Sequence, residues 1–63
     1  MANVKTATAE DFKTGSILKD PEGYEFIIMN KYDDGIWEAK SINGRGSKVI
    51  FENEARFYTT KEI

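Results

Sequence analysis

Cysteine and histidine are absent from this 63-residue sequence, and proline occurs once. Without cysteine there are no disulfides, thiolate ligands or thiol nucleophiles. Without histidine there is neither an imidazole ligand nor the usual proton shuttle near neutral pH. Paired carboxylates would need a cleft that a domain of this size hardly offers. We therefore predict that the chain is not an enzyme, holds no metal or cofactor, and acts on no small-molecule substrate.

Long apolar runs are also missing. Residues 1–10 contain one lysine and no apolar stretch of the length that a secretory signal requires. No later segment is long and apolar enough for a membrane span. Together with the lack of cysteine, which fits a reducing compartment, this predicts a soluble cytoplasmic protein that does not act at a membrane.

The charges are nearly balanced, with nine basic and eleven acidic residues and a net charge of −2. Such a chain has no general electrostatic attraction to a phosphate backbone, so nucleic acid ranks below protein as a partner. An apolar fraction of 40% is too high for a disordered chain of this charge. We assign residues 1–10 to a partly flexible N-terminal arm and residues 11–63 to one small domain.

Turn signals divide this domain into short strands. Asp-Pro-Glu-Gly at 20–23 has the pattern of a type I turn, and Asp34-Gly35 and Asn43-Gly44 are strong hairpin signals. The segments between them are rich in β-branched and aromatic residues. The predicted strands are 16–19, 24–30, 36–41, 48–52 and 56–61. We also predict a capped turn at 8–11 and a single 3₁₀ turn at 53–55.

Five short strands joined by tight turns favour a closed antiparallel barrel, because an open sheet would leave two unpaired edges. Period-two alternation, with charged residues kept outside, predicts which side chains form the core. The predicted core is Phe12, Leu18, Tyr24, Phe26, Ile28, Trp37, Ala39, Val49 and Phe51, with either Phe57 or Tyr58. The apolar residues predicted on the outer face are Ile17, Ile27, Met29, Ile36 and Ile50.

Three segments appear in an order that resembles the SH3-like barrel family. Residues 11–15 supply an aromatic plug and a glycine, residues 18–24 look like a first hairpin, and residues 53–58 are similar to the 3₁₀ turn before the last strand. The resemblance is to small bacterial and phage members and covers about residues 11–61. It implies a five-stranded barrel that works as a small non-catalytic binding module. Binding of proline-rich ligands is not carried over, because the Ala-Leu-Tyr-Asp-Tyr-like segment of signalling SH3 domains is absent.

The outer apolar residues are the leading candidate site. Ile27, Met29, Ile36 and Ile50 predict a protein interface, for a second copy of the chain or a larger partner. The alternative is that the N-terminal arm packs over this face, which would make these residues part of the fold.

The loop at 43–48 is the second candidate. Its glycines leave backbone N–H groups free, and Arg45 and Lys48, with Lys40 nearby, could contact phosphates in a weak nucleic-acid-binding domain of the KOW type. The alternative is a hairpin loop with solvated charges. Tyr24, Tyr32 and Tyr58 could likewise form an aromatic cage, or be half-buried structural residues.

Overall fold

Six short strands and two 3₁₀ helices make up the computed structural model, which describes residues 3–44 and 46–62 of the chain. In chain order these are β1 (Asn3–Thr6), η1 (Ala9–Asp11), β2 (Ile17–Lys19), β3 (Glu25–Asp33), β4 (Ile36–Ser41), β5 (Ser47–Phe51), η2 (Glu52–Phe57) and β6 (Thr59–Glu62). The predicted all-β class and the 3₁₀ segment before the last strand are confirmed. η2 is longer than predicted and takes the first residues of the predicted last strand.

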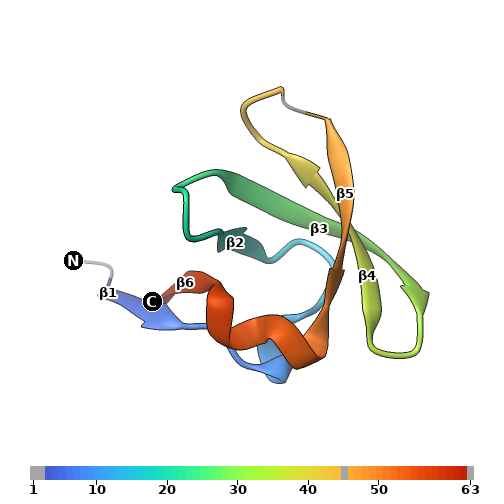
Figure 1. Cartoon of the computed structure of the whole chain (residues 1–63), viewed down its shortest axis with the longest axis horizontal. Helices are drawn as coiled ribbons and strands as arrows, with labels where there is room; N and C mark the ends of the chain where they lie inside the picture. The colour runs from blue at the N-terminus through green and yellow to red at the C-terminus, as the bar shows by residue number, and fades with distance from the viewer. Residues whose placement is uncertain (1–2, 45, 63) are drawn as a thin grey trace.

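The strands form one open antiparallel sheet in the order β1-β6-β2-β3-β4-β5 (Figure 1). The prediction of a closed five-stranded barrel is wrong. β1, which the sequence analysis does not predict, pairs along the outside of β6. In the part of the chain that the structure describes, β5 pairs with β4 alone, so the sheet ends there. Figure 1 shows η2 carrying the chain from β5 across to β6.

The turn at residues 20–23 is held by Asp20. Its carboxylate Oδ1 accepts hydrogen bonds from the main-chain N–H of Glu22 at 3.0 Å and of Tyr24 at 2.9 Å. Gly23 has a φ of +94°, a conformation that residues with a side chain rarely adopt. The turn predicted from the Asp-Pro-Glu-Gly pattern is therefore formed, and it fixes the register of β2 against β3.

Two irregularities interrupt the pairing of β3 with β4, one between Ile28 and Asn30 and one between Lys31 and Asp33. Each inserts an extra residue, so the alternation of faces shifts along β3. Strict alternation would place Lys31 on the outer face with Ile27, but it pairs with Trp37, and its ammonium lies 5.8 Å from the centroid of the Trp37 ring. Strict alternation fails here because the bulges cannot be seen in the sequence.

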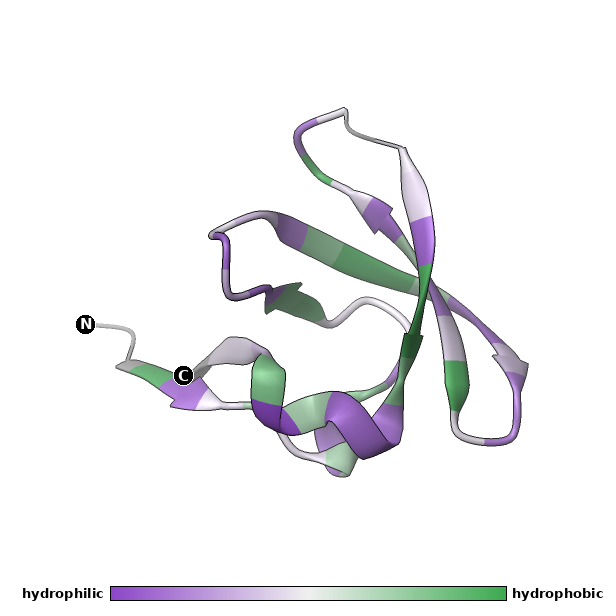
Figure 2. Ribbon diagram, viewed as in Figure 1, coloured by the Kyte–Doolittle hydropathy of each residue, from purple (hydrophilic) through white to green (hydrophobic). Residues whose placement is uncertain are grey.

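The core lies on the inner face of the bent sheet and is capped by the segment that follows β1. Figure 2 shows the apolar residues concentrated on β2, the middle of β3 and the end of β5. The buried residues are Ala7, Phe12, Leu18, Phe26, Ile28, Ala39, Ile50, Ala55 and Tyr58, with Tyr24 and Trp37 packed against them. Tyr58, rather than Phe57, completes the core, and its ring meets that of Phe12 edge to face at 6.5 Å. Most of the predicted core is thus confirmed.

The prediction for β5 is wrong, because its two faces are exchanged. Ile50, predicted outside, is 1% exposed, whereas Val49 and Phe51, predicted inside, are 43% and 39% exposed. The prediction assumed that Lys48 and Glu52 could not share the inner face with the core. Both do so at the rim of the core, where their charged ends find partners.

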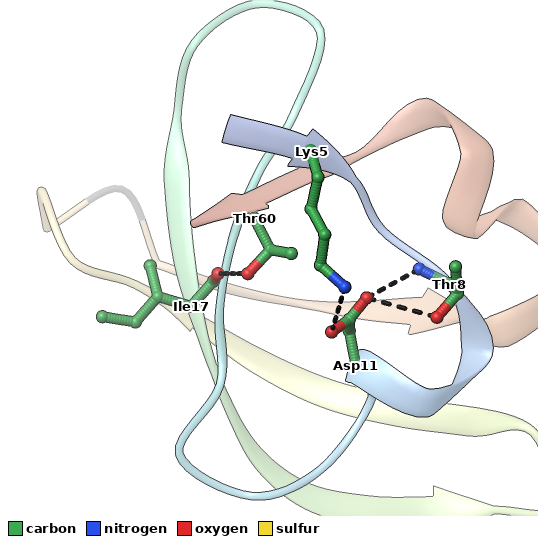
Figure 3. Close-up of polar contacts among 5 residues, drawn as sticks. All are labelled: Lys5, Thr8, Asp11, Ile17 and Thr60. Carbon is green, nitrogen blue, oxygen red and sulfur yellow. Dashed lines mark hydrogen bonds and ion pairs between the residues drawn. The ribbon is translucent and has the colours of Figure 1, made fainter. Parts of the chain in front are cut away.

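The start of the chain is tied to the sheet through Asp11 (Figure 3). Its Oδ2 accepts hydrogen bonds from the main-chain N–H of Thr8 at 2.8 Å and from the Thr8 hydroxyl at 3.3 Å, and Lys5 Nζ lies 3.5 Å from Oδ1. The predicted cap at Thr8 is confirmed in this form. The hydrogen bond from the Thr8 backbone, aided by the charge of Lys5, holds the pKa of the Asp11 carboxyl below its ordinary value, against an opposing contribution from burial.

Candidate protein interface

The four predicted interface residues do not lie together on one surface. Met29 is 40% exposed, and Ile27 and Ile36 are partly buried. Ile50 is buried in the core, so it is not part of this surface. The predicted patch is therefore reduced to three residues on β3 and β4.

A different apolar group occupies the end of the sheet at β5. Ile36 pairs with Phe51, and Val49 lies two residues before Phe51 on the same face. We call Ile36, Val49 and Phe51 the β5 strip. Val49 and Phe51 are both exposed, at the last strand of the sheet, where no further strand covers them within residues 3–44 and 46–62. The strip thus places exposed apolar residues next to an open edge of the sheet.

Charged residues separate the β5 strip from the apolar residues of β2 and β3. Glu38 and Lys40 are exposed on β4, and each pairs with a β5 residue on one side and a β3 residue on the other. On the far side of this row, Ile17 pairs with Ile27. The outer face thus carries two apolar groups with a polar row between them, rather than one continuous patch.

The charged ends of Lys48 on β5 and of Glu52 at the start of η2 each have a partner. The Trp37 indole N–H donates to Glu52 Oε2 at 2.7 Å. Lys48 lays its side chain over two rings, with Nζ 4.3 Å from the centroid of Phe26 and 5.4 Å from that of Tyr58. The same Nζ lies 3.9 Å from Asp20 Oδ2. A lysine can bury its stem on apolar surface while its ammonium stays at the rim, which is why Lys48 can face inward.

Burial also changes the pKa of Tyr58, whose ring lies under this lysine. Desolvation raises the pKa of Tyr58 above its ordinary value, and the carboxylates of Glu54 and Asp20 raise it further. The phenol is therefore neutral throughout the physiological range. This corner, formed by Asp20, Lys48 and Tyr58, is a structural contact with its charges already matched.

Of the three residues predicted to contact phosphates, the structure describes Lys40 and Lys48, and it does not bring these two together. Lys40 is exposed on the outer face, whereas Lys48 points to the inner face and is engaged by Phe26 and Asp20. Arg45 lies outside the described residues. The two described lysines are thus on opposite faces of the sheet, which does not support a joint phosphate site.

The tyrosines do not converge either. Tyr58 is part of the core, Tyr24 is half-buried just before β3, and Tyr32 is 72% exposed near the other end of β3. An extended strand of this length separates its ends by more than an aromatic cage can span. Tyr24 and Tyr32 therefore cannot line one cation site together.

A groove of about 620 Å³ opens between β2 and the β1–β6 pair. β2 and β6 pair at a single position, Lys19 with Thr59, and the Thr60 hydroxyl then donates to the Ile17 carbonyl at 3.1 Å (Figure 3). Lysines and carboxylates both line the groove, and one of these carboxylates, Asp11, is already bound by Lys5 and Thr8. Among the described residues that line the groove, charges of both signs are therefore mixed, and no set of one sign converges on a ligand.

In the part of the chain that the structure describes, no three histidine, cysteine or acidic side chains are grouped to hold a metal ion. No helix among these residues has the length and apolar character needed to cross a membrane.

The sequence analysis missed Val49 and Phe51 as surface residues. The Asn-Gly hairpin signal fixes a tight turn before β5 but leaves the face of each residue open. Comparison of the chain with protein-family models, with curated proteins and with solved structures finds no match in any of the three. The candidate site therefore depends on the geometry alone.

Proposed function

We propose that the chain is a small non-catalytic binding module that works through protein–protein contact at the β5 strip. The observation that carries this proposal is the exposure of Val49 and Phe51 side by side at an open sheet edge. Aromatic side chains such as that of Phe51 are enriched in the buried cores of protein interfaces, and an exposed apolar group with polar residues beside it is typical of an interaction surface. Behind them, the contacts of Lys48 with Asp20 and of Glu52 with the Trp37 indole hold the strand in place.

The organisation of the chain supports the same proposal. Four strands, β2–β5, follow one another as a meander, and the chain then returns through η2 so that β6 lies beside β2. This order supports a relation to the SH3-like barrels, with the sheet left open at β5. Within that group of folds the function depends on the site rather than on the fold, so the β5 strip decides the assignment.

Site-specific photo-crosslinking tests the proposal. p-Benzoylphenylalanine in place of Phe51 should give defined adducts with protein when the chain is expressed in the cells that produce it. Phe57 is the matched control, because it is also an exposed phenylalanine, 51% exposed, but lies on η2 beside Arg56. Adducts from position 51 and none from position 57 support the proposal. Equal labelling at both positions, or none at position 51, would overturn it.

A further inference from the structure

The turn between β4 and β5 contains an asparagine that is followed by glycine, at Asn43 and Gly44. The main-chain nitrogen of a residue can attack the side-chain amide of a preceding asparagine, because the two groups belong to one chain and close a succinimide ring. A glycine nitrogen is the least hindered for this attack, since no side chain stands beside it. The other asparagines, Asn3, Asn30 and Asn53, are followed by valine, lysine and glutamate.

Both reacting groups are free in the folded chain. Among residues 3–44 and 46–62, the Gly44 N–H has no hydrogen-bond acceptor and the Asn43 side-chain amide has no partner. Both residues are exposed. Gly44 has a φ of +78°, and beyond its chain neighbours no described atom lies within 4 Å of the position that a Cβ would occupy. Water and hydroxide therefore have open access to the reacting atoms.

The hydrogen bonds of this turn lie on either side of the reacting groups. The Asn43 N–H donates to Ser41 Oγ at 3.2 Å, and the Ser41 N–H donates to the Gly46 carbonyl at 2.8 Å. Neither bond uses the Gly44 nitrogen or the Asn43 side chain. The fold thus anchors the ends of the turn and leaves the Asn43–Gly44 peptide unprotected.

The other three asparagines are in regular secondary structure. Asn3 belongs to β1 and Asn53 to η2. Asn30 belongs to β3, and its Nδ2 donates to Glu38 Oε1 at 3.4 Å. Ring closure at these positions would require the main chain to leave its strand or helical conformation, which removes the advantage of proximity. Among the four asparagines, the structure therefore favours reaction at Asn43.

We propose that Asn43 is a site of spontaneous covalent modification, at which deamidation converts it to aspartate and isoaspartate. The Gly44 nitrogen loses its proton to hydroxide and bonds to Asn43 Cγ, and the Cγ–Nδ2 bond breaks as ammonia leaves with a proton from water. Water then opens the succinimide, at Cγ to give aspartate or at the main-chain carbonyl carbon to give isoaspartate. Water is the one reagent consumed, and the step needs no enzyme.

The products change both the charge and the length of the turn. Either one adds a carboxylate to a chain whose net charge is −2. In isoaspartate the main chain runs through the side-chain carbon of residue 43, so the backbone of the turn is longer by one atom. The bond between Ser41 and Gly46 closes this turn before β5 begins, so the disturbance should be greatest there and small at the β5 strip. The inference is thus independent of the proposed function.

Incubation of the purified chain in warm, mildly alkaline buffer tests the proposal. A peptide of residues 41–46 is incubated beside it until the peptide has lost its amide. In NMR spectra of the folded chain, the side-chain NH₂ signals of Asn43 should disappear while those of Asn30 and Asn53 remain. A more acidic species should appear on ion exchange, and it should form faster as pH rises because the attacking nitrogen must lose its proton.

Two variants assign the acidic species to its position. Asn43→Gln keeps an amide but lengthens the side chain, which disfavours ring closure, and should not form the species. Asn53→Gln is the matched control and should form it as fast as wild type. Retention of the Asn43 amide after the peptide has lost its own would show that the turn protects the site, and would overturn the proposal. Formation of the same species by Asn43→Gln at the wild-type rate would also overturn it.

Discussion

The two faces of β5 are oriented opposite to what hydropathy alone predicts. The face that carries Lys48 is turned toward the core, and the face that carries Val49 and Phe51 is turned toward solvent. The inner face presents Lys48 and Ile50, with Glu52 following at the start of η2, and the outer face presents the apolar Val49 and Phe51. The inner charges are stable there because Asp20 and the Trp37 indole meet them at the rim of the core. In a domain this small most inner positions are close to a rim, so a charged residue can belong to the inner face when its tip reaches a partner.

The largest difference in stability between substitutions on the two faces should appear at the neighbouring residues Ile50 and Val49. Ile50→Ala should lower the free energy of unfolding by about 3 kcal/mol, because it leaves a cavity in the core. Val49→Ala, one position away, should change it by about 0.5 kcal/mol or less, because the side chain is exposed. Urea denaturation of the two variants at low concentration measures both. Equal losses would break the distinction between the faces.

The contact between Glu52 and Trp37 should give the next largest effect. Glu52→Ala removes the acceptor of the indole N–H and should cost about 1–2 kcal/mol. Trp37 is the only tryptophan, so its fluorescence should also change. Glu54→Ala, on the exposed side of η2, is the control and should leave both the fluorescence and the stability near wild type. An unchanged spectrum for Glu52→Ala would argue against the contact.

Substitutions of Lys48 should change stability by a smaller amount. They distinguish the contribution of its aliphatic stem from that of its charge. Lys48→Ala loses both, at a cost of about 1 kcal/mol. Lys48→Met keeps the stem over Phe26 and should recover part of that loss. Lys40→Ala serves as the outer-face control, with no effect beyond about 0.5 kcal/mol. Thermal melts would rank the three, and a Lys40→Ala loss as large as that of Lys48→Ala would contradict the inward placement of Lys48.

The smallest effect concerns Asp11 and depends on pH. Because the folded state lowers the pKa of this carboxyl from 3.8, its contribution to stability is full above that value and is lost as pH falls through the lowered pKa. The difference in melting temperature between wild type and Asp11→Asn should therefore shrink as pH falls below 3.8. An NMR titration of the Asp11 carboxyl gives the pKa directly. A difference that grows on acidification would contradict the cap.

Much of the fold follows from local signals in the sequence. The turns at Gly23, Gly35 and Gly44 delimit the strands because each needs a positive φ. Alternation places Leu18, Phe26 and Ile28 correctly, since these positions precede the first bulge of β3. β1 was not predicted, because its four residues include a single apolar one, Val4, and gain their strand only by pairing with β6.

The candidate site could not be predicted in the same way. Its position depends on which face of β5 is buried, and this is decided by contacts far apart in sequence, such as Asp20 with Lys48 and Trp37 with Glu52. Local alternation contains no information about these partners. The inner position of Lys48 and Glu52 is visible only once β5 is placed against the core.

The most direct test of this account is the solvent exposure of the Val49 and Ile50 methyl groups in dilute, monomeric protein. A soluble gadolinium chelate broadens methyl signals according to their distance from solvent. The account predicts strong broadening for Val49 and little for Ile50. Strong broadening of Ile50 with protection of Val49 would show that the faces of β5 are the reverse of those described, and the proposed interface would then be wrong.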